Sequence, residues 1–292
     1  MKLTSKLVIL TGFALSIACS PQKKEDQSKS EAFDKAEAEV NEQIKEVITE
    51  MPSPSEIPFL LMETGVEYSP SLIHDLKDID SYTTNAKKAL NLGIYSTDVA
   101  YLSAYDKSQK ALKYVSSLKP IADQLALSSA FDPETIKQFE ANLDNTDSLA
   151  HIINEAVANA DAHLKSTERP KISALLLTGS FIEGLYIATA LIENYPDDLL
   201  PEDAKNLILI PLVDVVLKQE KPVTDLITLL KSVPTDETTQ TLIEDLQMVE
   251  AEYKKLDIKK LMDEGRGDLL LKDEALDALT NKMGKIRDDI TD

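Results

Sequence analysis

The stretch KISALLLTGSFIEGLYIATALIENYP, residues 171–196, is the most apolar part of the chain beyond its first 18 residues. An apolar run of this length without period-two alternation favours a helix that is buried on all sides. Gly179 and Gly184 lie inside it, and a residue without a side chain lets a neighbouring helix come close. The sequence therefore predicts a fold built around one central helix.

The rest of the chain carries helical rather than strand patterns. Apolar residues recur at steps of three and four, the spacing of one helix face, in residues 28–50, 80–127, 132–145, 146–166, 201–219, 222–234, 236–256 and 272–290. A break is expected near residues 105–107, and the pair Asp132-Pro133 is typical of a helix start. Trp is absent and aromatic residues make up only 5%, so strands are poorly supported. We expect an all-α bundle or array of roughly nine to eleven helices.

Two segments of the chain resemble each other. NLGIYSTDVAYLSA (residues 91–104) and LTGSFIEGLYIATA (residues 177–190) both place an aromatic residue two positions after a glycine. Each then continues with an acidic residue and a tyrosine, with offsets that differ by one. This similarity is compatible with an internal duplication, as in helical repeat arrays, or with two core helices of similar composition.

The helical part is expected to divide unequally. Residues 31–235 form the predicted main helical domain, and residues 236–292 form a C-terminal helical hairpin that packs on it. The apolar stripes of this last part are narrower and its charges are more numerous, which is typical of helices at a surface. The segment DEGRGD, residues 263–268, is the expected loop of the hairpin.

The first 18 residues have the order of a secretory signal peptide. Lys2 and Lys6 precede an apolar run from Leu7 to Ile17, and the small residue Ala18 follows. The run is shorter than the roughly 20 apolar residues that span a bilayer, and no later segment is expected to reach that length. We expect residues 1–18 to be removed and the rest to be exported.

The only cysteine in the chain follows directly. LSIAC, residues 15–19, resembles the lipobox of bacterial lipoproteins, although Ser16 stands where that family usually has leucine. The resemblance implies that Cys19 becomes the acylated N-terminus, so that fatty acids such as palmitate attach the protein to a membrane. Residues 19–30 then comprise the acylated cysteine and a polar, flexible tether.

The tether also bears on location. KKED, residues 23–26, resembles a signal that sends some lipoproteins of the Bacteroidota to the cell surface, although a charged linker can contain such a tetrapeptide by chance. Segments such as GSFIEGLYIA also resemble helical lipoproteins of unknown role from the same phylum. This resemblance implies no particular activity. The resemblance implies an outer-membrane protein at the periplasmic face or the cell surface.

The charge of the chain limits its partners. It has 31 basic and 51 acidic residues and a net charge of −20. Such a surface repels phosphate backbones and offers no basic stripe, so nucleic acid is not an expected partner. Attachment to a membrane is expected through the N-terminal lipid instead, and the remaining partner is expected to be another envelope protein.

Catalytic and metal-binding motifs are weak or absent in the sequence. The three histidines, His74, His151 and His163, form no recognised metal motif. Residues 142–153 resemble a calcium loop only superficially, because the glycine and the final glutamate of that template are missing; a helix start at Asn145 or Asp147 is the simpler interpretation. No nucleotide-binding or GxSxG motif occurs. We expect no metal, no cofactor and no enzymatic activity.

Carboxylates inside apolar helices are the most unusual polar residues. Asp98 precedes Tyr101 and Tyr105 by three and seven positions, so the three share a helix face, and Glu183 precedes Tyr186 by three. A buried carboxylate is costly unless it is satisfied. If the two helices pack, these side chains either line a polar pocket or make hydrogen bonds that fix the geometry of the core.

Two hypotheses for function follow. The first is a lipid-anchored envelope protein whose helical body is a non-enzymatic interaction or scaffolding module. The alternative is a lipoprotein that binds a small ligand in a polar pocket between the helices that carry Asp98 and Glu183.

Overall fold

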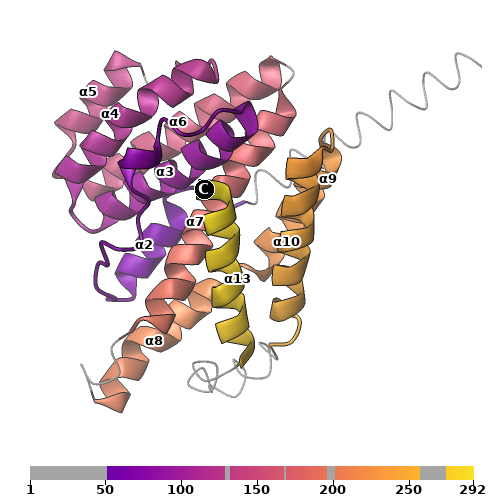
Figure 1. Cartoon of the computed structure of the whole chain (residues 1–292). Helices are drawn as coiled ribbons and strands as arrows, with labels where there is room; N and C mark the ends of the chain where they lie inside the picture. The colour runs from indigo at the N-terminus through magenta and orange to yellow at the C-terminus, as the bar shows by residue number, and fades with distance from the viewer. Residues whose placement is uncertain (1–50, 129–131, 168, 196–200, 257–273) are drawn as a thin grey trace, which may run out of the picture. The chain divides into compact units, whose positions relative to one another are not determined.

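A computed structural model describes residues 51–128, 132–167, 169–195, 201–256 and 274–292 (Figure 1). These residues form ten α-helices and one short 3-10 helix and contain no strand, so the prediction of an all-α, multi-helix protein is confirmed. The predicted signal peptide, Cys19, the tether, the helix expected up to residue 50 and the loop at residues 263–268 lie outside the described residues.

The bounds of the helices in the described residues are α2 Glu56–Glu63, η1 Leu76–Asp78, α3 Asn85–Ala104, α4 Ser108–Gln124, α5 Pro133–Ala141, α6 Thr146–Ser166, α7 Pro170–Glu193, α8 Glu202–Leu217, α9 Glu220–Ser232, α10 Glu237–Tyr253 and α13 Glu274–Thr291.

Local sequence explains several of these boundaries. The Asp132 side chain accepts a hydrogen bond from Thr135 N, and Pro133 is the first residue of α5, as predicted. Asn145 caps α6 in the same way. The break between α3 and α4 lies at Asp106, which has a φ of 56°. Such a left-handed residue directly after a helix reverses the chain and is typical of a helix end.

Helix α7 occupies the centre of the described helices (Figure 1). It packs against α3 most extensively and also contacts α2, α6, α8, α9 and α13. Contrary to expectation, α7 is long and apolar enough to cross a membrane by length and composition alone. However, 89% of its most apolar window is buried inside the protein, which is the environment of a core helix.

Two glycines bring α3 and α7 into backbone contact. A Cβ atom on Gly93 would lie 2.1 Å from Leu176 O, and one on Gly179 would lie 1.9 Å from Leu90 O. Any side chain at either position would force the helices apart. The role of Gly179 is therefore confirmed, whereas Gly184 faces only the side chain of Ile57.

A hydrogen bond joins the same two helices beside the glycine contacts. Leu90 lies against Gly179, and Thr97 donates a hydrogen bond to Ser180 O at 3.0 Å. The internal duplication stays a prediction.

The last helices pack on the centre as well as on each other. Helix α13 contacts α10, α7 and α3, and α10 contacts α9 (Figure 1). Helices α10 and α13 therefore contact each other, and the expected hairpin stays a prediction because residues 257–273 lie outside the described ones. The boundary between residues 31–235 and 236–292 stays a prediction.

Candidate functional site

The two carboxylates singled out in the sequence lie next to each other. Asp98 of α3 and Glu183 of α7 come about one helical turn after the glycine contact, and each has an exposed fraction of 0%. The charge of Glu183 raises the pKa of Asp98, so the protonation of one carboxyl group depends on the other. Two acidic groups in such a position cannot both be ionised without a large electrostatic cost.

Asp98 is best described as the protonated member of this pair. Its Oδ2 accepts a hydrogen bond from His74 N at 3.0 Å, whereas Oδ1 is buried without a donor. Burial, followed by the nearby charge of Glu183, raises the pKa of Asp98 well above its usual value. A proton on Oδ1 gives this oxygen a donor function toward Glu183, and no uncompensated charge remains on Asp98.

Glu183 is paired with a cation from the C-terminal helix. Arg287 of α13 donates from Nε to Glu183 Oε2 at 3.1 Å and from Nη2 to Oε1 at 3.4 Å. The guanidinium also lies 4.9 Å from the centre of the Tyr186 ring. Burial raises the pKa of Glu183 and the positive charge of Arg287 opposes this rise. Because Arg287 contacts Glu183, the single proton of the acidic pair belongs on Asp98.

The polar cluster also holds the segment between α2 and α3. Arg287 Nη2 donates to Leu72 O at 3.4 Å, and His74 supplies the amide that Asp98 binds. The His74 ring lies 2.7 Å from Tyr82 Oη, and Tyr114 Oη donates to His74 O at 2.8 Å. Burial, followed by the charge of Arg287, lowers the pKa of His74 to about 4. The imidazole is therefore neutral at neutral pH.

The remaining predicted tyrosines belong to an aromatic cluster. Tyr101 and Tyr105 have ring centres 4.9 Å apart, and Tyr68 lies 5.3 Å from Tyr101. Tyr101 Oη accepts a hydrogen bond from Ser69 N at 2.9 Å. Burial raises the pKa of Tyr101 to about 12. These rings fix the start of the same segment against α3.

The structure thus divides the predicted residues into two groups. Asp98, Glu183 and Tyr186 meet around Arg287, and Tyr101 and Tyr105 meet around Tyr68. Asp98 and Tyr101 accept hydrogen bonds from backbone amides and Glu183 accepts from Arg287, as expected if these side chains fix the geometry of the core, whereas Tyr105 Oη is buried without a partner among the described residues. Because both carboxylates are fully buried, the chemistry they offer is charge neutralisation and helix attachment.

Sequence reasoning did not identify Arg287 or His74. One signal for Arg287 was present, because the chain has only three arginines and 28 lysines. Arginine is the residue that suits a buried, two-pronged carboxylate pair. Arg287 also stands directly after Ile286, which is a buried residue of α13. No comparable signal marked His74, which lies in a loop.

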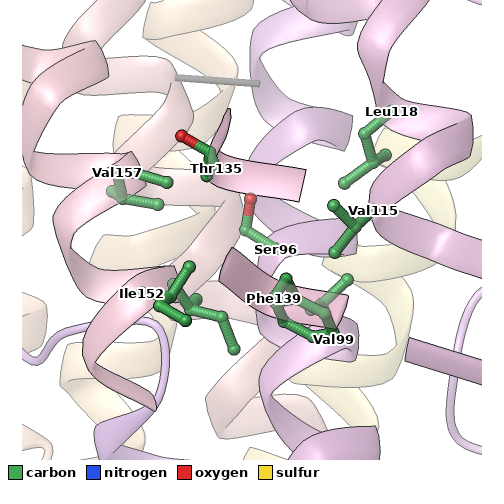
Figure 2. Close-up of a pocket in the computed structure, with 10 residues that line it drawn as sticks. Ser96, Val99, Val115, Leu118, Thr135, Phe139, Ile152 and Val157 are labelled. Atoms are coloured by element: carbon green, nitrogen blue, oxygen red, sulfur yellow. The ribbon is translucent and has the colours of Figure 1, made fainter. Parts of the chain in front are cut away.

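Of the predicted site residues, Tyr186 lines one of the hollows among the described helices, the one beside Asn194. An apolar cavity lies between α3, α4, α5 and α6 (Figure 2), and two open polar hollows lie beside Lys107 and beside Asn194. Neither Asp98 nor Glu183 lines these three. The polar pocket predicted between them stays a prediction. Within the described ranges, no group of three or more His, Cys, Asp or Glu side chains is placed to hold a metal ion.

No protein-family model, no curated protein and no solved structure matches this chain.

Proposed function

We propose that this chain is a lipid-anchored protein of the bacterial cell envelope, with a helical body that acts as a non-enzymatic interaction or scaffolding module. It is exported, and the outer membrane is its proposed location. Its partners are the membrane, through the lipid, and a second envelope protein.

The anchor is supported by the order of residues at the N-terminus. Two lysines, an apolar run and Ala18 precede Cys19, and a polar tether follows. With a net charge of −20, the body gains little from electrostatic adhesion to anionic lipid, so acyl chains are the proposed means of attachment.

The observation that carries the proposal for the body is the full burial of Asp98 and Glu183. Both have an exposed fraction of 0%, and they are neutralised by Arg287 and by a shared proton. The side chains that most resembled a reactive or ligand-binding pair in the sequence are occupied in attaching α13 and the segment before α3. A helical body with an acidic surface remains, which suits binding to another protein.

Replacement of Cys19 tests the anchor. Cys19→Ala is expected to abolish labelling by an alkyne fatty-acid analogue and to leave a longer, unprocessed precursor. The matched control is Ser20→Ala, which alters the adjacent tether residue and should label like the wild type. Labelling that persists in Cys19→Ala would exclude the anchor.

Co-purification tests the interaction module. The tagged protein is cross-linked in intact envelopes, solubilised, purified and analysed by mass spectrometry. A partner protein recovered in stoichiometric amount, which binds again to the purified body in size-exclusion chromatography, is the expected result. Recovery of the protein alone, together with a monomeric profile, would contradict a scaffolding role.

A further inference from the structure

An apolar cavity lies between four helices in the described part of the chain. Its wall is formed by Val99 of α3, Val115 and Leu118 of α4, Phe139 of α5, and Ile152, Ile153, Ala156 and Val157 of α6. Only Ser96 and Thr135 add hydroxyl groups, and the Ser96 hydroxyl already donates to Leu92 O at 2.7 Å. Figure 2 shows these side chains around a common space. A cavity with such a wall stays free of water.

Helix α5 covers this cavity with little attachment of its own. It has nine residues, of which Phe139 is buried, with an exposed fraction of 1%, and Ile136 packs on the core while partly buried. Its neighbours are α4 and α6. Burial of one phenylalanine side chain stabilises by roughly 1.5–3 kcal/mol. Displacing α5 is therefore a local opening that costs far less than unfolding the protein.

We propose that this cavity binds the end of a saturated hydrocarbon chain, which enters under α5 as the Phe139 ring moves aside. This inference goes beyond the proposed scaffolding function and does not depend on the lipid at Cys19. The cavity measures about 30 Å³, which admits a terminal methyl group but no ring. A chain can therefore enter methyl end first and displace Phe139 progressively.

The wall also selects against other ligands. None of the residues that line the cavity carries a charge, so a carboxylate or phosphate inside it would be unpaired and costly. Branched aliphatic side chains offer dispersion contacts with methylene groups along the whole path. The ligand is accordingly a neutral aliphatic chain, or an acyl chain whose polar head stays outside.

A titration with 1-decanol tests the site. Methyl resonances of Val99, Val115, Leu118, Ile152 and Val157 should shift together and saturate in the NMR spectrum of the whole chain. Amide hydrogen exchange in α5 should rise at least twofold in the bound state, because the bound chain displaces Phe139 and loosens this helix. Methyl shifts without any change in α5 exchange would overturn entry beneath this helix, and the absence of saturable shifts would overturn the site.

Two substitutions localise the alcohol. Ala156→Leu places an isobutyl group in the cavity and should weaken binding at least tenfold. Ala158→Leu makes the same change at an exposed position of α6 and should bind like the wild type. If Ala156→Leu fails to fold, Thr135→Leu fills the cavity from α5 instead. Wild-type affinity in a folded filling variant would place the alcohol elsewhere and refute the proposal.

Discussion

Replacing Asp98 by asparagine tests whether this buried acid carries a proton in the folded protein. Asparagine has nearly the shape of a protonated aspartate. Its oxygen can accept the hydrogen bond that His74 N gives to Oδ2 at 3.0 Å, and its amide can donate to Glu183 where a protonated Oδ1 would. Asp98→Ala removes both functions and serves as the contrasting variant.

The structure sets the expected magnitudes. Asp98→Asn should change the free energy of unfolding at pH 7 by less than about 1 kcal/mol, or increase it, because one hydrogen-bonding pattern replaces an equivalent one. Asp98→Ala leaves the buried His74 amide unpaired, which costs about 1–3 kcal/mol. It also leaves a small cavity, so the total loss should be about 2–4 kcal/mol.

The pH dependence gives an independent check. Burial and the charge of Glu183 raise the pKa of Asp98 in the folded state, whereas the unfolded residue releases its proton near pH 4. Between these values the folded state binds more protons, so the stability of the wild type falls as pH rises. Asparagine does not titrate. The stability of Asp98→Asn relative to the wild type should therefore increase with pH, by at most about 1.4 kcal/mol per unit.

Urea unfolding followed by circular dichroism at pH 5, 6 and 7 measures all three proteins. Equal losses in Asp98→Asn and Asp98→Ala, with a difference from the wild type that does not change with pH, would show that Asp98 is ionised. The assignment of the shared proton would then be refuted.

Three further predictions concern the same core. Gly179→Ala should destabilise the protein by about 3 kcal/mol or more in thermal unfolding, because the new Cβ meets the main chain of α3. The control is Gly284→Ala, whose Cβ meets a ring edge of Tyr186 at 4.0 Å. This variant should be neutral or stabilising in the same experiment. Arg287→Met should lower the free energy of unfolding by about 3–5 kcal/mol in urea, because it leaves Glu183 unpaired. The double variant that adds Glu183→Gln should regain at least half of this loss. A double variant that regains nothing would contradict the ion pair between Glu183 and Arg287. Burial lowers the pKa of His74 to about 4, so the unfolded state takes up a proton first as pH falls below about 6.5. Between pH 7 and 4 the free energy of unfolding of the wild type should therefore fall by at most about 3 kcal/mol relative to that of His74→Gln. Parallel stability curves for the two proteins would refute a buried neutral imidazole.

The fold was largely predictable because it depends on local patterns. The apolar run that became α7, the start at Asp132 and Pro133, and the break near Asp106 all follow from residues close in sequence. The sequence predicted that a neighbouring helix would come close at Gly179. It did not predict that this neighbour is the main chain at Leu90, because that contact depends on the three-dimensional packing.

The polar cluster shows where sequence reasoning ends. Asp98 and Glu183 were recognisable because charges are rare in apolar helices. Their partner Arg287 lies 104 residues beyond Glu183, and no local pattern specifies such a contact. His74 acts through its backbone amide, which every residue except proline possesses, so its identity could not reveal its role.

The intact mass of the protein purified from its native envelope tests the central functional claim most directly. A lipid-anchored protein should have lost residues 1–18 and should carry a diacylglycerol group and fatty acid on Cys19. Its N-terminal peptide should contain the whole added mass. A chain with an unmodified Cys19, whether complete or cleaved at another position, would contradict the anchor and with it the proposed place of this protein in the cell.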